Sequence, residues 1–161
     1  GGERIERVPR WPDTGGDPRV TLDMLDADSR RVAERATAPV LVPTGPWLAG
    51  LRLIDLGEHG HSLRARHQRS KVILQASRIA RHHPELPPRG PGNQRIRGVD
   101  GLVTENEGIR SASWIENGTA YTADLECGDA AAPECSGDAG FVALLDDLAI
   151  LPRPASVGGG R

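Results

Sequence analysis

Hydrophobic and polar residues alternate most clearly on both sides of Asn117-Gly118. Both residue types tolerate positive φ, so the pair predicts a two-residue hairpin turn over residues 116–119. Such a turn would place Trp114 opposite Tyr121. One face of the hairpin would then be mainly polar, and the other would carry Ala112, Trp114, Tyr121, Ala123 and Leu125. The pattern predicts an antiparallel hairpin with one buried and one solvated face.

Shorter apolar or alternating runs predict further strands. They cover residues 40–42, 51–56, 61–66, 71–79, 95–97 and 102–104. Residues 57–60 would join the second run to the third, and residues 67–70 would turn the chain into the fourth. Prolines and glycines fill residues 84–93, which we expect to form a loop because Pro supports neither a helix interior nor a central strand.

Two segments have helical character. The first, residues 28–36, would be capped by Asp26 or Asp28 and would end before Pro39. The second would be capped by Ser136 or Asp138, and its apolar positions follow i, i+3, i+4, i+7: Phe141, Leu144, Leu145 and Leu148. The prediction is an α+β fold, in which an antiparallel sheet of hairpins carries a C-terminal amphipathic helix on one face and a short N-terminal helix.

The length of 161 residues suits one domain with a modest, aliphatic core, because only 3% of the residues are aromatic. We expect a flexible lead-in over residues 1–19, a packed domain over 20–151 and a flexible tail over 152–161. No apolar run reaches the roughly 20 residues that a transmembrane helix needs.

The two cysteines, Cys127 and Cys135, lie eight positions apart. No further zinc ligand lies nearby at a suitable spacing, so a disulfide is favoured over a metal site; two unrelated thiols are the alternative. A disulfide favours an exported protein. The chain starts at Gly1 without a charged-then-apolar leader, which is expected if a signal peptide has been removed or if the chain is a fragment. Nineteen arginines against one lysine suggest a high-GC bacterial coding sequence.

Charge is strongly segregated, although the net charge is only −2. Residues 59–97 contain nine basic side chains and one acidic one, whereas residues 99–150 contain one basic and 11 acidic side chains. The two segments could neutralise each other across strands. Alternatively, the first could form a basic face for an anionic partner, centred on Arg64, Arg66 and Arg69. Specific nucleic-acid binding is not expected, because no recognition motif and few stacking aromatics are present.

Other candidate sites are weaker. The histidines His59, His61, His67, His82 and His83 lack a third ligand at a fixed spacing, so we expect neither a metal nor a cofactor. Glu105 and Glu107 could serve as paired carboxylates for acid–base chemistry, although they lie beside Gly108, as is typical of a polar turn. No G-x-S-x-G motif or phosphate-binding glycine loop before a helix is present.

The C-terminal part carries a pattern found in other proteins. Trp114, Glu116, Gly118 and Tyr121 form a W-x-E-x-G-x-x-Y hairpin, and an amphipathic helix follows. This pattern is similar to a domain of unknown function in the extracytoplasmic parts of anti-sigma factors and in lipoprotein-carrier-like proteins. Over residues 96–150 the chain also resembles uncharacterised exported proteins of high-GC, myxobacterial-type bacteria. The resemblance implies an extracytoplasmic location and brings no catalytic residues.

These observations favour a non-enzymatic, exported, envelope-associated domain. Its partner would be an envelope protein, a hydrophobic ligand or an anionic surface that binds on the sheet. Two alternatives remain open: a hydrolase-type enzyme that uses Glu105 or Glu107, and a purely structural envelope component. A deep pocket with converging polar groups would favour the enzyme.

Overall fold

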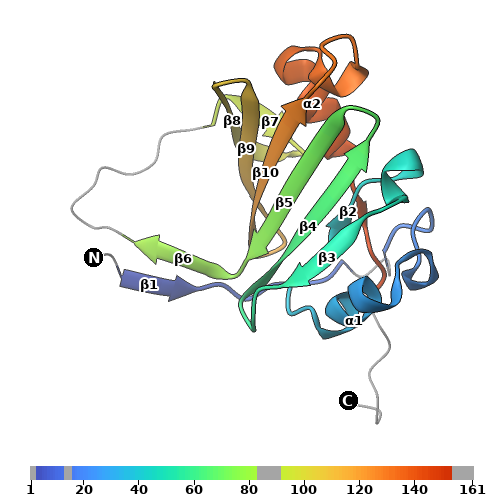
Figure 1. Ribbon diagram of the computed structural model, residues 1–161. Helices are drawn as coiled ribbons and strands as arrows, with labels where there is room; N and C mark the ends of the chain where they lie inside the picture. The colour runs from blue at the N-terminus through green and yellow to red at the C-terminus, as the bar shows by residue number, and fades with distance from the viewer. Residues whose placement is uncertain (1–2, 13–15, 83–91, 154–161) are drawn as a thin grey trace.

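The computed structural model describes residues 3–12, 16–82 and 92–153, and it has an α+β fold with mainly antiparallel strands (Figure 1). The helices are η1 (Leu22–Met24), α1 (Ala27–Arg35), η2 (Gly45–Leu48), η3 (Pro133–Cys135) and α2 (Gly137–Asp146). The main sheet has seven strands in the order β3-β4-β5-β10-β9-β8-β7. The predicted α+β class is therefore confirmed.

The strands of the main sheet follow one another as hairpins, apart from the step from β5 to β10. Their bounds are β3 (Arg52–Asp55), β4 (Gly60–His67), β5 (Ser70–Ser77), β7 (Gln94–Ile96), β8 (Val99–Asn106), β9 (Ile109–Glu116) and β10 (Thr119–Cys127). Two small antiparallel ribbons complete the fold: β1 (Glu3–Glu6) with β6 (Ile79–His82), and β2 (Leu41–Val42) with β11 (Ala149–Ile150).

Three Gly-containing turns connect β7 to β10. Their first central residues, Arg97, Glu107 and Asn117, have φ values of 51°, 53° and 50°, and each precedes a glycine that also has positive φ. Positive φ at both central positions is the geometry of type I′ turns, which suit the twist of neighbouring strands. Gly98, Gly108 and Gly118 are spaced by ten residues, which matches one strand plus one turn.

The register gives the main sheet two different faces. Trp114 lies opposite Tyr121, which in turn lies opposite Ala76 on β5. The buried face includes Leu53, Leu63, Ala65, Val72, Leu74, Ala76, Val103, Ala112, Trp114, Tyr121, Ala123 and Leu125. The opposite face, which we call the open face, carries the alternate residues of each strand. In Figure 1, α2, β2 and β11 all lie behind the main sheet.

The elements behind the sheet fill its buried face. Phe141 and Leu145 of α2 and Trp47 of η2 are buried in the same cluster as the sheet side chains. Helix α1 is fixed to the edge strand β3 through one serine, because Ser29 Oγ accepts a hydrogen bond from Leu53 N at 3.0 Å. Asp26 is the residue that caps α1, since its carboxylate accepts a hydrogen bond from Ser29 N at 2.9 Å.

Part of the expected lead-in is ordered, which is a departure from the sequence expectation. Residues 3–6 form β1, and further along Arg10 N donates to Asn117 O at 2.9 Å. Gly118 permits this approach, because a Cβ there would lie 2.2 Å from Val8 O. The pairing is long-range, so no local pattern signals it. The expected loop over 84–93 and tail over 152–161 lie mostly outside the described residues.

Candidate functional site

The exposed side of the β4–β5 hairpin carries the three arginines singled out from the sequence. Arg64 and Arg66 project from β4, and Arg69 lies in the turn that leads to β5. All three are exposed, and none forms an ion pair within the described residues. We refer to Arg64, Arg66 and Arg69 as the basic face.

The strand register places further cations beside the basic face. Arg52 lies directly opposite Arg64, and Lys71 lies directly opposite Arg66. Like charges directly opposite each other destabilise a sheet. Each of these two cations forms an ion pair with another element. Arg52 lies 3.1 Å from the carboxylate of Asp26, and Lys71 lies 3.1 Å from that of Glu126. Arg52 lies outside the basic segment of residues 59–97, and only the β3–β4 register brings it beside Arg64.

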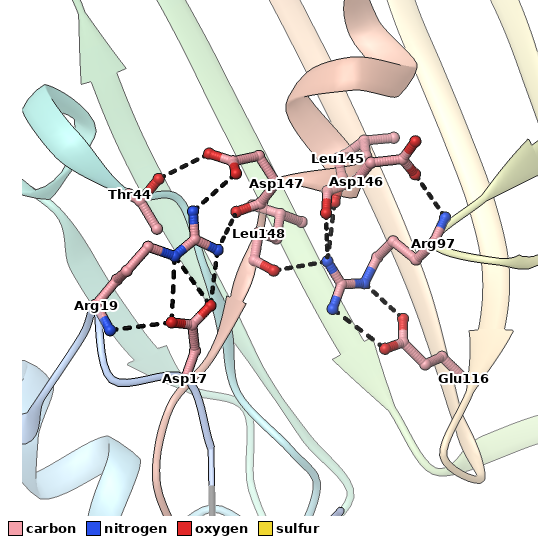
Figure 2. A network of polar contacts seen from close by, with 9 residues as sticks. All are labelled: Asp17, Arg19, Thr44, Arg97, Glu116, Leu145, Asp146, Asp147 and Leu148. Carbon is pink, nitrogen blue, oxygen red and sulfur yellow. Dashed lines mark hydrogen bonds and ion pairs between the residues drawn. The ribbon is translucent and has the colours of Figure 1, made fainter. Parts of the chain in front are cut away.

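Arg97, from the basic segment, forms an ion pair with an acidic residue inside the fold. Its side chain is 9% exposed, and Nε lies 2.7 Å from Glu116 Oε1 (Figure 2). Its Nη1 donates to the carbonyl oxygens of Leu145 and Leu148 at 3.0 and 2.7 Å, and its backbone N donates to Asp146 at 2.6 Å. A single arginine from the basic segment therefore attaches the C-terminal end of α2 to the sheet.

A second arginine attaches the N-terminal segment to the same end of α2. Arg19 lies 2.7 Å from Asp17 and 2.8 Å from Asp147, and Thr44 Oγ1 donates to Asp147 at 2.8 Å (Figure 2). Hydrogen bonds from Arg19 lower the pKa of Asp17, and hydrogen bonds from Arg19 and Thr44 lower the pKa of Asp147. These carboxylates are used in internal contacts, so the network in Figure 2 links the N-terminal segment to the C-terminal end of α2.

The disulfide lies at one end of the basic face. Cys127 at the end of β10 is bonded to Cys135 in η3, with their Cα atoms 6.1 Å apart. Next to it, Ser70 Oγ donates to Glu134 Oε2 at 2.5 Å. The segment between β10 and α2 is therefore held against the start of β5.

The described surface includes a larger and a smaller hollow. The larger, about 400 Å³, is mainly apolar and lies between η2 and α2; it is lined by Pro43, Thr44, Gly45, Pro46, Trp47, Pro133, Glu134, Gly140, Ala143, Leu144 and Asp147. The smaller, about 170 Å³, is lined by Arg66, Arg69, Lys71, Glu126, Cys127 and Gly128. Only the smaller one brings several cationic side chains together.

Glu105 and Glu107 do not form a paired site. Glu105 is 54% exposed and lies 3.0 Å from Arg110, which also contacts Asp138 at 2.6 Å. Glu107 occupies the β8–β9 turn at φ 53°. Neither residue lines either hollow described above. The geometry therefore supplies no observation in favour of the hydrolase hypothesis.

The described histidine side chains occupy three different environments. His59 lies 3.2 Å from Glu58, the ring of His67 packs 5.5 Å from that of Trp47, and His61 is buried at 4% exposure. Within the described residues, no three His, Cys, Asp or Glu side chains lie close enough to hold a metal ion. Burial lowers the pKa of His61 to about 4, and the carboxylate of Asp55 opposes this shift in part.

We expect the burial of His61 to make the protein acid-sensitive. The unfolded chain binds a proton at His61 with a pKa near 6.5, whereas the folded protein does so only near pH 4, so the free energy of unfolding falls as the pH decreases from about 6.5 to 4. The loss should approach about 3 kcal/mol, at 1.36 kcal/mol per pKa unit. Urea denaturation across this range measures it. His61→Gln should flatten the profile above about pH 5, whereas His67→Gln should keep it; an unchanged slope in His61→Gln would contradict the assignment.

The chain matches no protein-family model, no curated protein and no solved structure. Within the described residues, no helix is both long enough and apolar enough to cross a membrane.

Proposed function

We propose that this chain is an exported, envelope-associated binding module that engages an anionic partner through the basic face, without catalysing a reaction. The disulfide between Cys127 and Cys135 supports an oxidising compartment. The W-x-E-x-G-x-x-Y resemblance to extracytoplasmic domains points to the same location.

The observation that carries the proposal is the arrangement of the β4–β5 hairpin. Arg64, Arg66 and Arg69 are exposed on it without an ion pair in the described chain, although the neighbouring strand β10 carries Asp124 and Glu126. Arg97 and Lys71 show that this fold pairs other cations of the same segment with Glu116 and Glu126. Cations without ion pairs repel one another, and like charges directly opposite each other on neighbouring strands add to this repulsion. A bound anion would reduce the repulsion.

The buried face of the sheet is a poor candidate for ligand binding. Tyr121, Phe141 and Leu145 are 1%, 0% and 0% exposed, so the space between the sheet and α2 is filled by the protein's own side chains. Tyr121 also donates its hydroxyl to Pro39 O at 2.6 Å, which closes the core on that side. Of the two faces of the main sheet, the open face is therefore the one available to a partner.

Vesicle binding tests this proposal. Wild-type protein should bind phosphatidylglycerol-containing vesicles at low salt and bind phosphatidylcholine vesicles weakly. Binding should fall at about 0.15 M salt, where the screening length is about 8 Å. Each arginine near an anionic surface contributes about 1 kcal/mol, so Arg64→Gln/Arg66→Gln/Arg69→Gln should weaken binding about 100-fold. Heparin should respond in the same direction.

A charge-matched control separates the basic face from net charge. Arg10→Gln/Arg31→Gln/Arg35→Gln removes three exposed cations elsewhere on the chain. It should retain most of the binding, because attraction weakens with distance beyond the screening length. Equal binding by wild type and both triple variants would reject the basic face as the binding surface.

A further inference from the structure

The smaller hollow lies at the end of the basic face where β5 and β10 meet the turn between β4 and β5. Its cationic lining comes from three places: Arg66 at the end of β4, Arg69 in the turn, and Lys71 at the start of β5. Register places Arg66, Lys71 and Glu126 in one row across three strands. The cations therefore come from one hairpin turn, and the sheet pairing brings Glu126 of β10 beside them.

The charges around this hollow leave a net charge of +2. Three cations line it together with a single carboxylate, Glu126, whose Oε2 lies 3.1 Å from Lys71 Nζ. This contact orients the lysine and compensates one charge. The two guanidinium groups have no ion pair within the described chain, and such groups bind tetrahedral oxyanions through two parallel hydrogen bonds.

The frame of the hollow is covalently and sterically restrained. Cys127 is bonded to Cys135, and Gly128 N donates to Arg69 O at 2.8 Å. Gly128 is needed for this close approach, because a Cβ there would lie 2.7 Å from Arg69 O and 2.9 Å from Arg69 Cβ. The absence of a side chain at this position also lets the Arg69 side chain lie across it. The backbone that carries the cationic groups is therefore held in place by the end of β10.

We propose that this hollow is a seat for one dianionic tetrahedral oxyanion, of the kind presented by a phosphate monoester group. A phosphate monoester carries a charge of about −1.5 to −2 near pH 7, which matches the net charge of the lining. The volume of about 170 Å³ is below the range of about 300–1,000 Å³ typical of sites for drug-sized ligands, so the hollow accommodates the charged group and leaves the rest of the ligand outside. The inference rests on the proposed function, since it names the chemical group that the basic face recognises.

Inorganic phosphate is the first probe. Titration of the full chain at constant ionic strength should produce saturable amide shifts in NMR spectra, centred on Arg69, Cys127 and Gly128, with sulfate acting similarly and chloride not. Hydrogen bonds to charged groups contribute about 1.5–3 kcal/mol, so Arg69→Gln should weaken phosphate binding about 10- to 100-fold. Arg66→Gln should act in the same direction. Arg31→Gln, on α1 and outside the basic face, should stay within about twofold of wild type.

Vesicles distinguish a lipid headgroup from free phosphate as the source. At matched surface charge, phosphatidic acid should bind more tightly than phosphatidylglycerol, and Arg69→Gln should abolish that preference. Saturable phosphate binding without a lipid preference supports the seat and assigns it to a phosphate group in solution. A linear, non-saturating response to phosphate, or equal effects of Arg31→Gln and Arg69→Gln, would overturn the seat.

The two proposals fail separately. If phosphate does not saturate but vesicle binding still depends on the basic face, diffuse attraction remains and only the seat is rejected. If phosphate saturates at Arg69 and Gly128 but wild type binds no anionic vesicle or heparin, the seat holds and the proposed role of the basic face is rejected.

Discussion

Replacing Trp114 with alanine is expected to lower the free energy of unfolding by about 3–5 kcal/mol, as is usual when a large buried ring is removed. Trp114 is 3% exposed and stacks on Tyr121 with ring centroids 5.5 Å apart. Its Nε1 also donates to Glu116 Oε1 at 2.9 Å. Because single domains are stable by only about 5–15 kcal/mol, this variant should unfold at a much lower urea concentration.

Ser113→Ala is the matched control for this experiment. Ser113 is the neighbour of Trp114 on β9 and lies on the open face, opposite Thr122. Its replacement should change the free energy of unfolding by less than about 0.5 kcal/mol, as is typical of surface sites. Equal destabilisation by the two variants would show that the face assignment of β9 is wrong.

Replacing Arg97 with methionine is expected to have a similarly large effect, about 3–5 kcal/mol, because it leaves a carboxylate without its partner in a poorly solvated place. Glu116 is 13% exposed and Arg97 is 9% exposed. The variant also loses the hydrogen bonds to the carbonyl oxygens of Leu145 and Leu148 at the end of α2. Urea denaturation followed by circular dichroism measures the loss.

A second substitution separates the charge effect from the lost packing. Arg97→Met/Glu116→Gln should be more stable than Arg97→Met alone by about 1–3 kcal/mol, because no uncompensated charge remains while Trp114 keeps an acceptor. Arg95→Met, at an exposed position of β7 just before the turn that contains Arg97, should change stability by less than about 0.5 kcal/mol. A cost for Arg97→Met as small as that of Arg95→Met would show that the Arg97 network is not stabilising.

The local signals in the sequence correspond to elements of the structure because turns and caps depend on neighbouring residues. Asn117-Gly118 forms the turn between β9 and β10, and Asp26 caps α1. The turns at Arg97-Gly98 and Glu107-Gly108 have the same geometry. Their first residues favour a type I′ turn less strongly than asparagine does, so the ten-residue spacing of the glycines is a weaker signal in the sequence. Strand β11 was also missed, since a pair of residues carries no periodicity and its partner β2 lies over 100 positions away.

The candidate site was only partly accessible from the sequence. Arg64, Arg66 and Arg69 stand out through their density in residues 59–97, and the cysteine spacing suggests a bridge between Cys127 and Cys135. The charge segregation by itself left both exposure and internal pairing open. The structure divides the segment: Arg97 and Lys71 pair with acidic residues, and the basic face does not.

The sequence by itself determined the features that depend on near neighbours: the α+β class, the Asn-Gly turn, the first helix and the concentration of cations in one segment. Tertiary structure alone decided which cations meet. Arg52 opposes Arg64 through register, Lys71 aligns with Glu126 across the β5–β10 pairing, and Gly128 lies against Arg69 where the two strand ends meet. Register and sheet order arise from side-chain packing over the whole buried face, and a shift by one residue would reverse the face of every side chain. The position of a charge in space is therefore a property of the whole fold.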